Sequence, residues 1–247
     1  MSTVKSPDEK LKEMVEEFYL KNKRSIRKKD FDIFHCSVQQ KLWEANFYSD
    51  QIKNFNAESF TYSQTTDLTT GTATIIYGLD KDAISKYCNL FLDGYFTSVM
   101  SIFDSLAHEV NSLFRILPSN HDTKIYISTI IKKLKEKMPN SEFYKYISKI
   151  IKKRWWRILE NFRNAITHEV IIAKEIEISY DATLGKEVLK KIPLPDNPKR
   201  RPFTYKKEYE LKSFIETFHK DVWPILEHCY KRLIKDLEKS NKLPIKL

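Results

Sequence analysis

The longest regular pattern in the sequence runs from Asp82 to about Leu117, where apolar side chains recur every three or four residues. This spacing predicts one central α-helix about 50 Å long, because an α-helix rises about 1.5 Å per residue. The chain contains 4 glycines and 9 prolines, and the prolines are concentrated between Pro193 and Pro202, so most of the remainder is free to be helical. The sequence therefore predicts an all-α fold.

The composition favours a globular protein with an anionic partner. Of the 247 residues, 41% are hydrophobic, which is enough for a substantial core. The formal charge of +10 and the pI near 9.2 favour binding to a polyanion, since basic surfaces attract phosphate backbones. Lysine-rich proteins of other functions carry similar charge, so composition alone leaves RNA and other partners open.

Membrane segments, disulfides and metal sites are all unexpected for this sequence. No window approaches the roughly eighteen apolar residues of a membrane span, so we expect a soluble, cytoplasmic protein without a membrane partner. Cys36, Cys88 and Cys229 are widely separated and form no CxxC pair. His35 and His228 each precede a cysteine, but adjacent side chains on a helix diverge by about 100°. We therefore expect no metal site and no cofactor.

The N-terminal part of the chain is interpreted from the same periodicities. Amphipathic helices are expected over residues 8–30 and 34–55, followed by a threonine-rich extended connection with a short hairpin near residues 72–78. The second helix is expected to be buried on two sides. Its expected buried residues are Val38, Leu42, Ala45 and Ser49 on one side and Trp43, Phe47 and Tyr48 on another.

The C-terminal part is expected to contain a helix over residues 123–138 and a longer helix from Ser141, a candidate N-cap, to about Ala173. The following strands and proline-rich loop precede one last amphipathic helix. We interpret the chain as a single helical bundle, residues 1–247, made of an N-terminal helical part (1–62), core helices (83–173), a small β-hairpin insertion with a prolyl loop (174–207) and a C-terminal helix (208–238).

The stretch ENFRNAITHEVI, residues 160–171, places unusual polar residues in a helical segment. At about 100° per residue, one side of this helix is apolar and the opposite side is polar. The apolar side contains Trp155, Leu159, Phe162 and Ile166. The polar side contains Arg157, Asn161, Asn164 and His168, with Arg163 and Glu160 beside it.

This polar side has two interpretations. It can be a solvated surface, as most polar helix faces are. However, neighbouring surface positions use lysine, whereas this side uses asparagine and histidine, which are weaker helix formers. The residue types also suit phosphodiester chemistry, because histidine moves a proton near neutral pH and arginine presents a fork of donors to phosphate.

Cleavage of RNA by its own 2′-hydroxyl needs a base and an acid on opposite sides of the phosphorus. A single helix offers one imidazole, His168. A two-fold axis beside the motif helix would bring a second His168 and a second Arg163 into one cleft. The hypothesis therefore includes a homodimer formed through the motif helix.

The segment FRNAITH resembles the signature of the HEPN superfamily, in which an arginine and a polar residue precede a histidine late in a long helix of an α-bundle. Here Arg163, Asn164 and His168 fit that pattern, with four residues between the arginine and the histidine. The long preceding helix and the C-terminal helix after a prolyl loop are similar to the bacterial toxin and defence branch. The resemblance covers most of residues 83–238.

The resemblance implies a metal-independent endoribonuclease that acts as a homodimer and leaves 2′,3′-cyclic phosphate and 5′-hydroxyl ends. It also implies a toxin or antiviral role, with an antitoxin or an activator protein as a possible partner. Some members of the superfamily have lost catalysis. The alternative is therefore a non-catalytic HEPN-like module for RNA binding or dimerisation.

Two further groups are weaker candidates. Asp104 and His108 are four residues apart on the central helix and are candidates for orienting His168, although such pairs are more often structural. Arg157 and the loop residues Lys199, Arg200 and Arg201 are candidates for RNA contacts, because lysine and arginine neutralise phosphates. A solvated loop explains the last three equally well.

Overall fold

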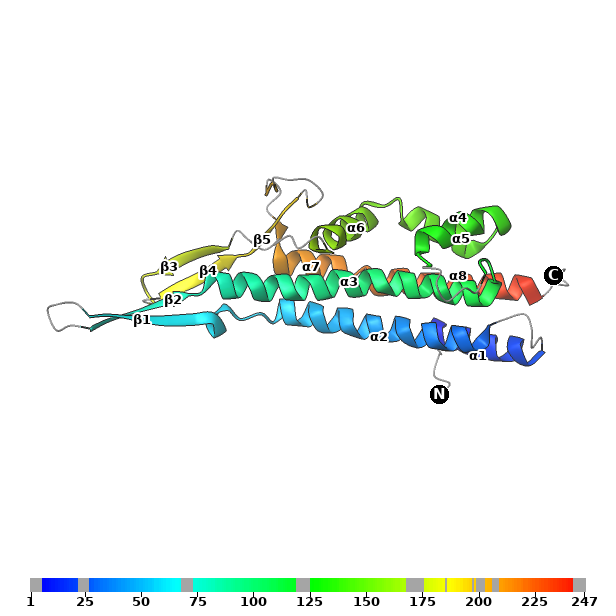
Figure 1. Cartoon of the computed structure of the whole chain (residues 1–247), viewed down its shortest axis with the longest axis horizontal. Coiled ribbons are helices and arrows are strands. Elements are labelled where there is room, and N and C mark those ends of the chain that lie inside the picture. The colour runs from blue at the N-terminus through cyan, green and yellow to red at the C-terminus, as the bar shows by residue number, and fades with distance from the viewer. Residues whose placement is uncertain are drawn as a thin grey trace. The chain divides into compact units, whose positions relative to one another are not determined.

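The computed structural model describes residues 6–21, 27–67, 73–118, 125–167, 176–184, 186–196, 198, 203–205 and 209–241. The described residues are mostly helical, with small two-stranded hairpins (Figure 1), which confirms the predicted all-α fold class. They form two compact units. The first comprises Met1–Glu44, Ser98–Leu159 and Lys220–Leu247, and the second Ala45–Thr97 and Glu160–His219.

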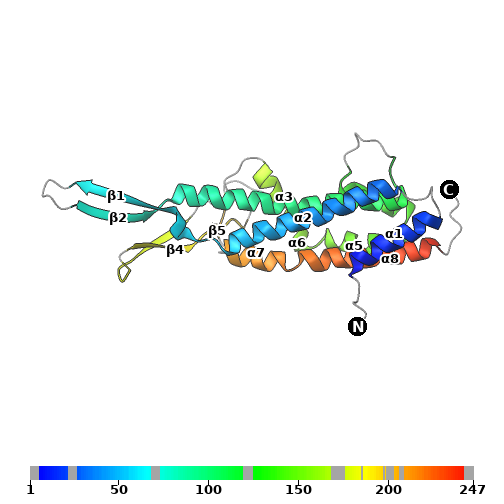
Figure 2. The same ribbon diagram turned by 90° about the horizontal axis from the view of Figure 1, so that it is seen from below.

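The first unit is a helical bundle. It contains α1 (Pro7–Lys21), α4 (Ile127–Lys137), α5 (Glu142–Ile150), α8 (Val222–Asn241) and parts of α2 (Lys28–Lys53), α3 (Lys81–Phe114) and α6 (Arg154–Thr167). Helix α8 contacts both α1 and α5 (Figure 2). Its core is apolar and includes the fully buried side chains of Leu11, Phe31, Phe103, Leu106, Phe143 and Leu233.

A buried carboxylate joins α5 to α8. Ser141 is the N-cap of α5, as predicted, and its Oγ accepts a hydrogen bond of 3.0 Å from the backbone N–H of Tyr144. The carboxylate of Asp236 accepts a bond of 2.6 Å from the Ser141 hydroxyl and bonds of 2.8 and 3.0 Å from the N–H groups of Glu142 and Phe143. The first turn of α5 is therefore satisfied by a side chain of α8.

The expected continuous helix from Ser141 to Ala173 is interrupted, because α5 ends at Ile150 and α6 begins at Arg154. The buried side chains of the two helices explain the break, since on one straight helix they would point about 150° apart. A reorientation between the helices lets both bury their apolar sides. These buried residues are Phe143, Ile147 and Ile150 in α5 and Trp156, Leu159 and Phe162 in α6.

The expected C-terminal helix is also two helices, α7 (Leu211–His219) and α8, which begins at Val222. Pro224 lies in the first turn of α8. Proline has no N–H and its ring clashes with the carbonyl four residues earlier, so a helix cannot pass through it undisturbed, whereas the first turn tolerates it. The prediction of one helix was wrong because the effect of Pro224 was overlooked.

The N-terminal helices also differ from their predicted limits. Helix α1 ends at Lys21, and α2 begins at Lys28 rather than near residue 34. Helix α2 buries the first predicted side, but Trp43 is 66% exposed and Phe47 is 42% exposed. The prediction that these two residues are buried on a second side was therefore wrong. Periodicity identifies an apolar stripe but not whether a neighbour covers it.

The second unit contains the hairpins. Strands β1 (Thr61–Asp67) and β2 (Ala73–Leu79) pair antiparallel after the 3₁₀ turn η1 (Ala57–Phe60). The remaining antiparallel pairs join β3 (Glu177–Asp181) to β4 (Lys186–Lys191) and β5 (Pro193–Leu194) to β6 (Tyr209–Glu210). The β3–β4 pair is the hairpin predicted before the C-terminal helices.

Within the second unit, a glycine sets how closely α2 and α3 approach. The ring of Tyr48 lies against Gly94, and a Cβ at this position would meet ring atoms at 2.6 Å or less. Contacts that short do not occur between real side chains. Gly94 is therefore required here for close packing rather than for an unusual backbone conformation.

Candidate active site on helix α6

Helix α6 carries the predicted motif. Its buried side includes Trp156, Leu159, Phe162 and Ala165. The predicted apolar side was centred correctly, but Trp155 and Ile166 are half-buried rather than buried. Because the buried residues recur every three positions, they lie on one side of the helix, and the opposite side faces away from the core.

Phe162 anchors the end of α6 that carries the motif. Its ring stacks on Phe96 of α3, with centroids 4.8 Å apart and planes at 10°, and it contacts Phe214 of α7 at 5.3 Å. Phe96 also makes an edge contact with Phe218 at 5.7 Å. Buried aromatic clusters of this kind have specific geometry, so they fix the rotation of the helix about its axis. The next residue, Arg163, is positioned by this packing.

Arg163 and Asn164 interact with each other at the surface. Arg163 is half-buried and Asn164 is exposed, and the guanidinium Nη1 donates a hydrogen bond of 3.2 Å to the Asn164 amide oxygen. The asparagine thereby orients a group whose planar fork suits phosphate. The amide nitrogen of Asn164 is itself a donor suited to a phosphate oxygen or an imidazole.

The third motif residue, His168, lies outside the described residues, which end in this region at Thr167. Its place next to Arg163 therefore stays a prediction. Lys199, Arg200 and Arg201 also lie outside the described residues.

The remaining polar residues of α6 lie where the helical spacing places them. Arg157 is exposed, and Glu160 and Asn161 are half-buried. Arg157 is one and two turns from Asn161 and Asn164 along the same side of the helix. Their proposed contacts with RNA stay predictions.

Asp104 and His108 have structural partners in the first unit. The Asp104 carboxylate accepts a bond of 3.3 Å from the backbone N–H of Ile127, at the start of α4. The His108 ring stacks on Phe34 with centroids 4.2 Å apart, and burial lowers the pKa of His108 below its usual value. These contacts are those of a helix cap and a packed ring. A role for either residue in orienting His168 stays a prediction.

A buried polar cluster was not predicted from the sequence. His35 Nδ1 lies 2.8 Å from Glu109 Oε1, which also accepts a bond of 3.4 Å from the Tyr230 hydroxyl. Burial raises the pKa of Glu109, whose side chain is 0% exposed. One signal was present, because Glu109 lies three residues after Leu106 on the apolar side of α3.

Two kinds of feature are absent from the described residues. No group of three or more His, Cys, Asp or Glu side chains in the described part of the chain is arranged to hold a metal ion. Within the same residues, every helix is too short or too polar to cross a bilayer.

The chain matches the family model for the Cthe2314-like HEPN domain over residues 35–231. This match covers most of the chain, which therefore belongs to the Cthe2314-like HEPN family. Comparison with curated proteins and with solved structures finds no match. The predicted HEPN superfamily membership is thus confirmed, while the assignment of FRNAITH as the motif stays a prediction.

Proposed function

We propose that the protein is a metal-independent endoribonuclease that acts as a homodimer in a toxin or antiviral defence role. HEPN family membership supports a function connected with nucleotides or RNA, and HEPN domains are often ribonucleases. The observation that carries the proposal is the hydrogen-bonded pair of Arg163 and Asn164 on the outward side of an anchored helix, four residues before a histidine in the sequence.

The proposed reaction is an internal transfer at phosphorus. His168 takes the proton of the 2′-hydroxyl, whose oxygen attacks phosphorus. The bond from phosphorus to the 5′-oxygen breaks, and that oxygen receives a proton from the His168 of a second copy. The products are a 2′,3′-cyclic phosphate and a 5′-hydroxyl, so atoms and protons balance without an added reactant.

Arg163 and Asn164 have separate roles in this proposal. Charge develops on the phosphoryl oxygens as the 2′-oxygen attacks, and a guanidinium held in place stabilises it without reorganisation. Asn164 keeps Arg163 oriented through its amide oxygen and donates from its amide nitrogen to phosphate or to imidazole. The anchoring of Phe162 matters because the positions of Arg163 and Asn164 must be fixed before the substrate binds.

The decisive experiment measures cleavage of tRNA and of mixed single-stranded RNA in EDTA, with product ends mapped. Wild type should produce cyclic-phosphate ends. His168→Ala should cleave about 100-fold to 10,000-fold more slowly, because it removes the proton-transferring group. His121→Ala, which removes a histidine outside the motif, is the matched control.

Light scattering should show a dimer in all three proteins. A His168→Ala variant that cleaves at the wild-type rate would contradict the mechanism. Intact RNA after incubation with wild type, together with salt-sensitive RNA binding, would instead support the non-catalytic RNA-binding or dimerisation module. Growth arrest on expression of wild type but not of His168→Ala would support the toxin role, and its suppression by a co-expressed protein would reveal an antitoxin.

A further inference from the structure

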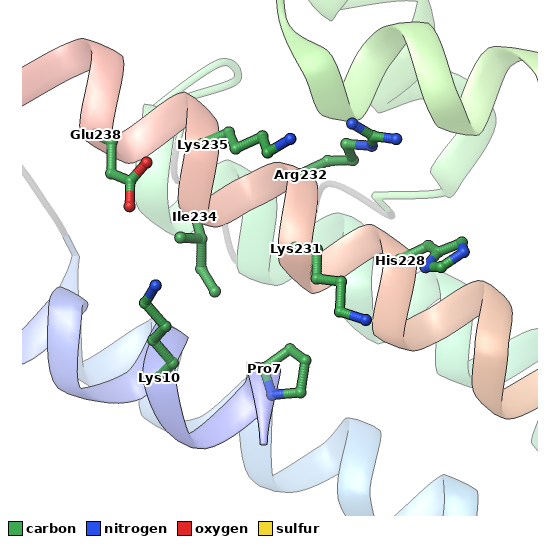
Figure 3. A pocket seen from close by; sticks show the side chains of 8 residues that line it. All are labelled: Pro7, Lys10, His228, Lys231, Arg232, Ile234, Lys235 and Glu238. Carbon is green, nitrogen blue, oxygen red and sulfur yellow. The ribbon is translucent and has the colours of Figure 1, made fainter. Parts of the chain in front are cut away.

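A basic groove lies in the first unit, between α1 and α8. It has a volume of about 490 Å³, and its lining includes Lys10 of α1 and His228, Lys231, Arg232 and Lys235 of α8 (Figure 3). Small-molecule sites typically have volumes of about 300–1,000 Å³. The groove is therefore large enough for a ligand rather than for water alone.

The spacing of the α8 cations creates the positive wall. Lys231 and Lys235 are four residues apart and lie on one side of the helix, while Arg232 lies about 100° from Lys231 around the helix axis. Lys10 points from α1 toward α8 and Lys231 points from α8 toward α1, whereas the side chain of Arg232 points away from α1 (Figure 3). Ile234, which is 6% exposed, contributes an apolar surface to the same lining. The groove thus combines cations from both helices with a small apolar surface.

The charges in the groove limit the net charge of the ligand that it can bind. Lys10, Lys231, Arg232 and Lys235 are positive and Glu238 is negative, so the lining has a formal charge of about +3 if His228 is neutral. Lys231 forms an ion pair of 2.6 Å with Glu227, which reduces the charge available to a ligand. An anion with two or three negative charges matches the positive charge of the lining that remains.

Acidic residues at the borders favour a small ligand over a nucleic-acid strand. Exposed Glu9 and Glu13 flank Lys10 on α1, and exposed Glu238 follows Lys235 on α8. A long polyanion would have to pass these carboxylates, whereas a compact anion would not. Glu238 is also positioned at the edge of the groove as an acceptor for a hydroxyl or an amino group.

We propose that this groove binds a small organic phosphate, a phosphate monoester or a diphosphate with two to three negative charges. Lys10, Lys231 and Lys235 hold the phosphate oxygens, Ile234 contacts the organic part and Glu238 accepts a hydrogen bond from it. The site is built from the first unit alone and does not involve α6 residues after Leu159. It is therefore independent of the proposed nuclease.

Isothermal titration calorimetry at low ionic strength, with pyrophosphate as the probe and sulfate for comparison, tests the proposal. The test variant is Lys10→Ala/Lys235→Ala. The matched control is Lys12→Ala/Lys135→Ala, which removes the same charge from exposed positions that do not line the groove. The test variant should bind pyrophosphate at least about tenfold more weakly, while the control stays within about twofold of wild type.

Three outcomes would overturn the proposal. These are no heat of pyrophosphate binding with wild type, equal weakening by the test and control variants, and binding of sulfate as tight as that of pyrophosphate. A fourth outcome, with RNA as the ligand, would also overturn it. If a single-stranded RNA oligomer without a terminal phosphate binds the groove and pyrophosphate fails to displace it, the groove is an RNA-binding surface instead. Circular dichroism confirms that both variants fold.

Discussion

The two units place polar side chains in contrasting environments. In the first unit, Asp236 is 3% exposed and Glu109 is fully buried, and both bond to groups on other helices. In the second unit, Arg163 is half-buried and Asn164 exposed, and the bond between them joins neighbours on one helix. The first arrangement holds helices together, because unsatisfied buried polar groups are costly.

The contrast separates structural polar residues from candidates for function. A bond between distant elements is lost on unfolding and contributes to stability, while a bond between adjacent surface residues contributes little to it. Asp104 shows why this matters, since its sequence spacing to His108 suggested a site but its carboxylate accepts from the start of α4. Changes at polar residues bonded between helices should therefore affect stability, and changes at the Arg163–Asn164 pair should affect activity.

The largest expected stability effect is at Asp236. Asp236→Ala removes the acceptor of three hydrogen bonds at the start of α5 and leaves buried donors unsatisfied. We expect a loss of about 3 kcal/mol in the free energy of unfolding, with a smaller loss for Asp236→Asn, which keeps one acceptor. Urea denaturation measures both. A loss below about 0.5 kcal/mol for the alanine variant would remove the contrast between the units.

A packing change in the second unit should have the next largest effect. Gly94→Ala places a methyl group against the Tyr48 ring, so the helices must separate or the ring must move. We expect a loss of about 1–3 kcal/mol from overpacking. The double variant Gly94→Ala/Tyr48→Ala should suffer less than the two single changes combined, because the clash is gone. Simple additivity in thermal denaturation would contradict this contact.

Glu109 should make stability depend on pH. Burial raises its pKa in the folded state, so its contribution to stability is present below the usual value near 4.5 and is lost as pH rises through the folded-state pKa. Glu109→Gln stays neutral and lacks this loss. The variant should therefore gain stability relative to wild type between pH 4 and pH 8, by no more than about 1.4 kcal/mol per pH unit. Parallel stability curves in urea titrations would rule this out.

The smallest expected stability effect is at Asn164. Asn164→Ala removes an exposed amide and one surface hydrogen bond, so the free energy of unfolding should change by less than about 0.5 kcal/mol. If the pair orients Arg163 for catalysis, the same variant should slow RNA cleavage by about tenfold or more. Unchanged cleavage with unchanged stability would mean that Asn164 is an ordinary surface residue. A large loss of stability would mean that it has a structural role like that of Asp236.

Local features of the sequence predicted much of the fold. The central helix α3 was expected from Asp82 to about Leu117 and is observed as Lys81–Phe114. The Ser141 cap and the hairpin before the C-terminal helices also follow from local chemistry. These features depend on residues close together in the chain, where helical periodicity and turn preferences act directly.

The sequence names candidate site residues, but it does not show which contacts hold them in place. The short motif identified Arg163 and Asn164, and the periodicity identified the side of α6 on which Asn164 lies. The packing of Phe162 against Phe96 and Phe214 joins segments far apart in the sequence. Such contacts leave no local pattern, because any large apolar residue at these positions satisfies the periodicity.

The sequence by itself determined the helical class, the approximate limits of the central helix α3 and a resemblance to the HEPN superfamily that the family match confirms. The tertiary structure decided where α5 ends and α6 begins, which apolar side of α2 is covered, and that Glu109 and Asp236 are buried. It also brought Lys10 of α1 opposite Lys231 of α8. The physical reason is that burial and charge depend on which distant segment becomes the neighbour, whereas periodicity describes only one helix at a time.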